Sequence, residues 1–257
     1  MKYYKTVLMC LFFLLAISEV SNAQGLVTEI LKEMEKRQEL GVDVTVKVKT
    51  TTQRVRQGTR LQQFIYYLRD SEDAYLFMGI SPENNKGVGY LRVEGNNWYY
   101  RPNTRTFQHL SRSDRIAGTD MTVQDIEKRK FTEMYGPVTD ENGNEIYTEE
   151  MLGKIPVYKF EVRAKVKDVN YRKLIYWVRR DNYLELKRDD YSLSDTLMYT
   201  NYTLKYTKIE DRYLPIKGMR VDQFEEGNKT IYEYSGISLE PVDDAVFTKA
   251  YLENLSK

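Results

Sequence analysis

The chain has 257 residues, a formal net charge of +1 at pH 7, one histidine and one cysteine. Basic and acidic residues are interspersed along it, so the sequence contains no extended basic surface of the kind that binds nucleic acid. Its 22 tyrosines favour a β-sheet, because tyrosine suits the half-buried surface of a strand. The length suffices for one large domain with its own hydrophobic core.

The N-terminal segment has the three-part layout of a secretory signal. Lys2 and Lys5 precede an apolar run at residues 7–17, and Ser21-Asn22-Ala23 follows it. A membrane anchor is the alternative, but the run is shorter than the roughly 20 residues that cross a bilayer. We expect cleavage after Ala23, which leaves a soluble single domain at residues 24–257 that works outside the cytoplasm.

Removal of this segment changes the chemistry that the chain can offer. Cys10 leaves with the signal, so the mature chain has no disulfide, thiol nucleophile or thiolate metal site. The loss of Lys2, Lys5 and Glu19 subtracts one net positive charge from +1 and leaves zero.

One helix and then a series of strands are predicted along the mature chain. Between Gly25 and Leu40 apolar residues recur at helical spacing, and Gly41 ends the pattern. Strict alternation begins at Val42 and returns at residues 158–166. Met198, Tyr202, Leu204 and Tyr206 are expected to share one face of a later strand. We count about ten antiparallel strands, a loop with a helical turn at 114–127, and a second helix or turn at 243–255.

A sheet of about ten strands cannot stay flat, because strand twist accumulates across it. It either closes on itself as a sandwich or barrel, or wraps around its few helices and encloses a cavity. The pattern alone leaves both options open.

The motifs that could carry chemistry are weak. His109 is the single imidazole and no Gly-x-Ser-x-Gly elbow accompanies it, which disfavours a hydrolase and a zinc site. The segment 140–145 is interpreted as a hairpin turn rather than a calcium loop, and 87–89 as a strand start rather than a phosphate loop. The acid pairs Asp189-Asp190 and Asp243-Asp244 are interpreted as surface residues. We expect no catalytic residue, no cofactor and no metal.

The stretch 86–125 resembles the bacterial outer-membrane lipoprotein-sorting family, the relatives of the carrier LolA. It contains a glycine-flanked strand at 87–93, Trp98-Tyr99-Tyr100-Arg101-Pro102, Arg105, and Gly118-Thr119-Asp120-Met121 before Asp125. Further matches lie at 176–178, 184–187, Phe247 and 251–252, so the resemblance covers nearly the whole mature chain. Thr119 and Met121 depart from the serine and phenylalanine of the family pattern, which leaves ligand preference open.

This resemblance implies a mainly β fold, in which a strongly curved antiparallel sheet forms a half-open barrel with a few covering helices. It also implies a hydrophobic cavity for acyl chains. Candidates to line that cavity are aromatic and aliphatic strand residues, with ordinary core packing as the alternative: Leu91, Trp98, Tyr100, Ile175 and Trp177. The residues of the family-motif loop are Pro102, Arg105, Gly118, Thr119, Asp120 and Asp125.

The expected function is that of a non-enzymatic periplasmic carrier or chaperone for lipoprotein sorting in outer-membrane biogenesis. It would receive a lipoprotein or lipid from an inner-membrane ABC- or RND-type transporter and pass it towards an outer-membrane acceptor. The alternative is a lipid-binding or sensory module of the same fold whose ligand never leaves. A hydrolase of envelope lipids or glycans is a third, disfavoured hypothesis.

The first prediction concerns export. We expect the exported protein to begin at Gln24, because the small residues at 21–23 form the cleavage site. Intact-mass analysis of the protein from its native host tests this. Retention of Met1 on protein recovered in the membrane fraction would contradict both the signal and a soluble carrier.

Overall fold

The computed structural model describes residues 25–116, 119, 121–127, 129–209 and 212–255. The expected signal peptide, Gly118 and Asp120 lie outside the described residues.

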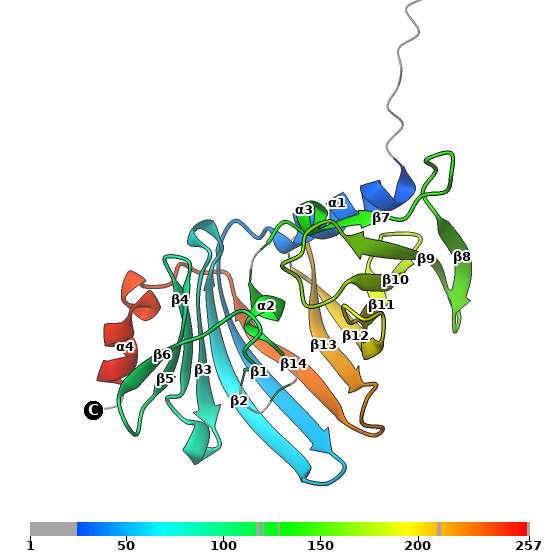
Figure 1. Cartoon of the computed structure of the whole chain (residues 1–257). Helices are drawn as coiled ribbons and strands as arrows, with labels where there is room; N and C mark the ends of the chain where they lie inside the picture. The colour runs from blue at the N-terminus through cyan, green and yellow to red at the C-terminus, as the bar shows by residue number, and fades with distance from the viewer. Residues whose placement is uncertain (1–24, 117–118, 120, 128, 210–211, 256–257) are drawn as a thin grey trace, which may run out of the picture.

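Fourteen antiparallel strands form one continuous sheet that curls into an open trough (Figure 1). Their order is β6-β5-β4-β3-β2-β1-β14-β13-β12-β11-β10-β9-β7, with β8 paired to β9. The strands are β1 (Asp43–Arg54), β2 (Gly58–Arg69), β3 (Ala74–Ser81), β4 (Gly89–Val93), β5 (Asn96–Arg101), β6 (Thr106–His109), β7 (Tyr135–Pro137), β8 (Tyr147–Leu152), β9 (Ile155–Ala164), β10 (Lys173–Arg179), β11 (Glu185–Tyr191), β12 (Leu197–Ile209), β13 (Arg212–Asp222) and β14 (Lys229–Ser238).

Few helices accompany this sheet. The α-helices are α1 (Leu26–Gln38), α2 (Val123–Ile126), α3 (Phe131–Met134) and α4 (Lys249–Asn254), and the short 3-10 helices are η1 (Asp70–Glu72), η2 (Glu83–Asn85) and η3 (Asp244–Phe247). The predicted curved, half-open sheet with few helices is confirmed. The estimate of about ten strands was too low, because a strand as short as β7, with three residues, shows no alternation.

Helix α1 lies across the top of the trough (Figure 1) and is fixed there by packing and by a cap. Val27, Ile30 and Leu31 are buried against side chains of β9 and β10. The Glu145 carboxylate accepts hydrogen bonds from the backbone N–H groups of Val27 (2.6 Å) and Thr28 (3.2 Å). A carboxylate suits this position, because the N-terminus of a helix carries partial positive charge.

The strap, residues 111–127 as far as they are described, covers the other half of the inner face. Ile116 and Val123 pack into an inner-face cluster with Phe64, Phe77 and Tyr90 of the strands beneath. Figure 1 shows α2, part of the strap, inside the curve of the sheet.

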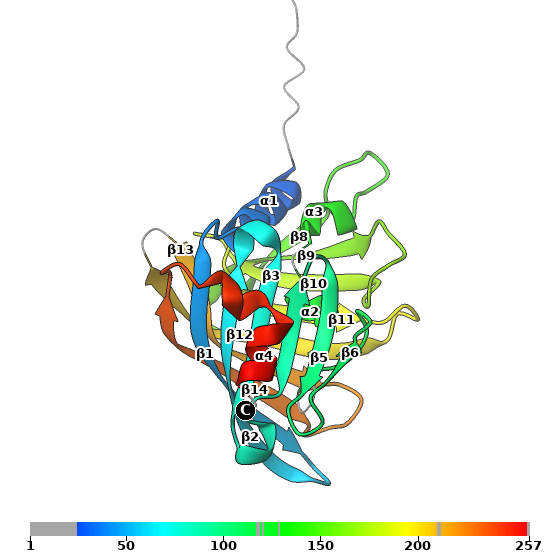
Figure 2. The ribbon, with the colours of Figure 1, turned by 90° about the vertical axis from the view of Figure 1, so that its left-hand side faces the viewer.

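The C-terminal segment covers the opposite, outer face, which is seen towards the viewer in Figure 2. Val246, Phe247 and Leu252 form a buried cluster there with Leu76 and Tyr100. Gly89 allows α4 to approach closely, since a Cβ at this position would lie 2.6 Å from a methyl carbon of Leu252. The predicted second helical segment at 243–255 thus covers a second hydrophobic core on the outer face of the sheet.

A bulge changes one predicted face. The register of β12 on β13 shifts twice, between Thr203 and Lys205 and again between Lys205 and Tyr206. Tyr206 lines the same cavity as Thr203, although strict alternation would place residues three positions apart on opposite faces. The expectation that Met198, Tyr202, Leu204 and Tyr206 share a face is corrected accordingly.

The packing of α4 gives the second prediction. Leu252→Ala should lower the free energy of unfolding by about 2–5 kcal/mol, because it opens a cavity in the outer core. Leu255→Ala, at a half-exposed position one turn later, is the control and should cost less than about 0.5 kcal/mol. Urea unfolding of both variants measures the difference. Equal costs would mean that α4 is not anchored in this way.

Candidate functional site

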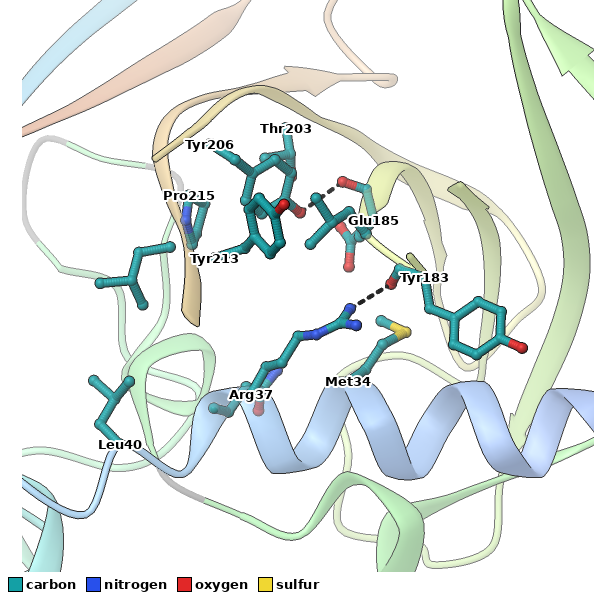
Figure 3. A pocket seen from close by; sticks show the side chains of 12 residues that line it. Met34, Arg37, Leu40, Tyr183, Glu185, Thr203, Tyr206, Tyr213 and Pro215 are labelled. Atoms are coloured by element: carbon teal, nitrogen blue, oxygen red, sulfur yellow. Dashed lines mark hydrogen bonds between the residues drawn. The ribbon is translucent and has the colours of Figure 1, made fainter. Parts of the chain in front are cut away.

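A cavity of about 390 Å³ opens on the inner face between the end of α1 and the β12–β13 hairpin (Figure 3). We call it the α1 cavity. Its walls are mostly apolar and include Met34, Leu40, Leu184, Tyr206 and Pro215. The volume lies within the range of about 300–1,000 Å³ that is usual for ligand pockets.

The cavity continues across the inner face as two smaller hollows of about 190 and 160 Å³. The first shares Thr203 and Pro215 with the α1 cavity. The two hollows share Arg220 and Tyr232 with each other, and the second ends at Met121 of the strap. The inner surface is therefore hollowed from the end of α1 to the strap.

Polar groups also line the α1 cavity. The Arg37 guanidinium donates hydrogen bonds to the backbone oxygens of Asn182 (2.6 Å) and Tyr183 (3.0 Å). The Tyr206 hydroxyl donates to the backbone oxygen of Glu185 at 2.7 Å. Burial raises the pKa of the Glu185 carboxyl, an effect that the charge of Arg188 opposes.

A charged network lines the hollow that is nearest to the strap. Arg220 donates to Asp125 Oδ2 at 3.1 Å, to Asp190 Oδ2 at 3.2 Å and to Asn201 Oδ1 at 2.9 Å. Arg188 Nε donates to Asp190 Oδ1 at 2.6 Å. Two arginines thus face two aspartates, and each charge has an opposite partner, as burial requires.

Asp125 joins this network to the strap. Its Oδ2 accepts hydrogen bonds from the backbone N–H (2.8 Å) and the hydroxyl (3.0 Å) of Thr122, which forms the capping box of α2. Burial would raise the pKa of Asp125, but the charge of Arg220 and these hydrogen bonds outweigh it and lower the pKa below its ordinary value. One carboxylate therefore both caps α2 and holds it to β13.

Ion pairs also connect the strap to β4 on one side of the trough and to the β9–β10 loop on the other. Glu127 pairs with Arg92 of β4 at 3.0 Å and with Arg112 at 2.5 Å. Arg112 also forms an ion pair with Asp168 in the loop between β9 and β10. These contacts bridge strands that lie far apart in the sheet order.

A family model described as an uncharacterized protein matches residues 71–254. No curated protein matches the chain. Many solved structures match the chain, and three of the most similar share its fold. An outer membrane lipoprotein-sorting protein domain from Vibrio parahaemolyticus is 17% identical with a TM-score of 0.74, and the match covers 88% of this chain and 97% of that one.

The second structure is a LolA superfamily protein from Nitrosomonas europaea, which is 22% identical with a TM-score of 0.70 and coverages of 87% and 97%. The third is a DUF1329 family protein from Desulfovibrio piger, which is 20% identical with a TM-score of 0.75 and coverages of 87% and 96%. The chain belongs to the family of the model that matches residues 71–254, and its fold is LolA-like.

The LolA-like structure places the five expected cavity residues on the outer face. Leu91 and Tyr100 are buried beneath η3 and α4, and Trp98 packs at the edge of this cluster, with Lys249 Nζ 3.2 Å from its ring centroid. In β10, on the other side of the trough, Leu174 and Tyr176 point inward to α1. Their neighbours Ile175 and Trp177 therefore point outward by alternation. The expected placement is corrected: these residues lie away from the inner cavity, and the alternative of ordinary packing fits their positions.

The residues of the family-motif loop divide into two groups. Pro102 and Arg105 lie in the turn between β5 and β6, where Arg105 is exposed and has a φ of 53°. Thr119 and Asp125 lie in the strap. The Thr119 hydroxyl donates to the backbone oxygen of Ile116 at 2.9 Å and accepts from the Met121 N–H at 3.2 Å, so it closes the loop rather than facing the cavity.

Asp189 and Asp190 are buried, which corrects the interpretation of this pair as surface residues. Their side chains point to opposite faces, Asp189 to Thr200 (2.8 Å) and Asp190 to the inner network. Arg37, Arg188 and Arg220 are not among the site residues that the sequence predicts. A signal was present for Arg188 and Arg220, since each is a charged residue in a strand at an inward position of its alternation.

Within the described ranges, no helix is long and apolar enough to span a membrane. Across the same residues, no group of three or more histidine, cysteine, aspartate or glutamate side chains could hold a metal ion.

The third prediction tests the tie between strap and sheet. Asp125→Asn should cost about 1–3 kcal/mol at neutral pH, because Arg220 loses one of its two carboxylate partners but keeps Asp190. Asp181→Asn, at an exposed pair with Arg179, is the control and should cost less than about 1 kcal/mol.

The pH dependence of this cost has a defined sign. The stability from Asp125 is fully present above the ordinary aspartate pKa of 3.8, and is lost as the pH falls through the lowered pKa of the folded state. The difference between wild type and Asp125→Asn should therefore shrink in acid, which urea unfolding at pH 7 and at about pH 3 measures. A difference that does not change with pH would exclude the charge pair as its cause.

Proposed function

We propose that this protein is a periplasmic carrier that holds the acyl chains of a lipid or lipoprotein in the inner-face cavity and moves them between the two membranes. The observation that carries the proposal is the α1 cavity, with its apolar walls on the inner face of an unclosed sheet. The likeness of the fold to a lipoprotein-sorting domain supports it.

The energetics of acyl burial suit a carrier with a partly open site. Each buried methylene contributes about 0.8 kcal/mol, so complete enclosure of a 16-carbon chain would contribute roughly 13 kcal/mol. Such a complex would release its ligand slowly. The α1 cavity is open at its mouth and leaves part of a long chain uncovered, which balances solubility against release.

Localisation and partners are parts of the same proposal. The N-terminal signal supports export and a mature domain at residues 24–257. We propose an inner-membrane ABC- or RND-type transporter as the donor and an outer-membrane acceptor as the recipient, because the resemblance to the sorting family implies both. A binding module that never releases its ligand is the rival, and transfer of a labelled lipid between two vesicle populations distinguishes the two.

The fourth prediction concerns a variant whose larger side chain fills part of the α1 cavity. Thr203→Trp should weaken binding of a fluorescent acyl probe about tenfold, because a bulky ring excludes about two methylenes at roughly 0.8 kcal/mol each. Tryptophan suits a strand position, so folding should survive. Leu193→Trp, at an exposed site after β11, is the control and should bind the probe like wild type.

Probe displacement and urea unfolding on each variant supply the measurement. If Thr203→Trp folds normally and binds the probe as tightly as wild type, the α1 cavity is not the acyl site.

A further inference from the structure

Arg37 is a fixed cation in the wall of the α1 cavity. It lies in the last turn of α1, and its side chain extends from the helix towards Tyr183 and Glu185 (Figure 3). Its two hydrogen bonds to the backbone oxygens of Asn182 and Tyr183 fix the plane of the guanidinium. A guanidinium has five N–H donors, so further donors remain for a ligand.

The charge of Arg37 is not neutralised by an ion pair. Both of its hydrogen-bond partners are neutral carbonyl groups, and no carboxylate pairs with it in the part of the chain that the structure describes. Glu185, the carboxylate in the cavity wall, lies with Oε2 3.9 Å from Nη1 of Arg188 and is paired there. Glu33, one helical turn before Arg37, lies near the Tyr183 side chain. Arg37 is thus the cation of this cavity that is left for an anion.

Apolar walls begin beside this cation. Met34 precedes Arg37 by one helical turn and lines the same cavity, and Leu184 and Leu214 line it from the sheet. An anionic group at Arg37 therefore has an apolar space next to it, which is the arrangement that a charged head and a hydrocarbon tail require.

We propose that Arg37 binds the anionic head group of an amphiphile, a carboxylate or a phosphate, whose acyl chain occupies the α1 cavity. This inference rests on the proposed function and narrows its cargo to an anionic lipid. Guanidinium pairs with carboxylate and phosphate in the same forked geometry, so both anions satisfy the site.

Three ligands with one chain length test the proposal by displacement of a fluorescent acyl probe: dodecanoate, dodecyl phosphate and dodecanol. Wild type should bind at least one of the two anions about tenfold tighter than the alcohol, which is the scale of a charge-assisted hydrogen bond. The stronger of the two anions identifies the head group. Arg37→Gln should abolish this preference and leave dodecanol binding within about twofold of wild type.

Two controls separate head-group binding from structure. Lys36→Gln removes the same charge at the adjacent, exposed position of α1 and should keep the anion preference. Arg37→Lys keeps the positive charge but lacks the forked geometry of the guanidinium, so it should keep part of the anion preference. The ratio of anion to alcohol affinity is the readout, because a purely structural loss would lower both affinities together.

The outcomes distinguish this inference from the function on which it rests. Equal affinity of wild type for anions and alcohol, or a loss of anion and alcohol binding together in Arg37→Gln, would overturn the head-group assignment alone. Absence of binding of the probe and of all three ligands to wild type would overturn the acyl carrier itself.

Discussion

The constraint on which this molecule depends is the twist of a sheet of 14 antiparallel strands. Twist accumulates from strand to strand, so the sheet must curl, and curling creates an inner face that the opposite strands do not fill. Both faces of the sheet carry apolar side chains. The chain covers them with different segments, α1 and the strap inside and α4 outside. A cavity remains where α1 ends and the strap does not reach.

The inner face is organised by charge as well as by shape. A wholly apolar trough of this width would favour collapse of the covering segments onto it at many positions. The pair of Asp125 and Arg220 selects one position for α2, because a displaced strap would leave the Asp125 carboxylate without its arginine and Arg220 with only Asp190 as a carboxylate partner. The arginine and aspartate side chains in the middle of the trough thus separate two apolar regions, one under α1 and one under the strap.

Much of the fold follows from patterns that are local in sequence. Alternation at residues 43–48 and 158–162 and helical spacing at 26–34 each describe a segment that forms as predicted. The assignment of faces could not be obtained in this way, because alternation shows that Trp98 and Tyr100 share a face but not whether that face is concave. The cover of the outer face comes from α4, about 150 residues later, and the partner of Arg220 in the strap is 95 residues away. Such pairings depend on the tertiary fold, so the sequence alone could not assign the face on which Trp98 and Tyr100 lie.

The centre of the sheet joins the two ends of the described chain, since β1 pairs with β14 and these strands begin at residues 43 and 229. Because β1 is synthesised early and β14 late, one hydrogen-bonding edge of β1 stays unpaired until residues 229–238 have been synthesised. An exposed edge is a template for pairing with other chains. A polypeptide cut short before residue 229 would keep two open edges, at β1 and β13, in what should be the interior of the sheet. Pairing of β14 with both β1 and β13 therefore removes two edges at once and joins the two halves of the sheet.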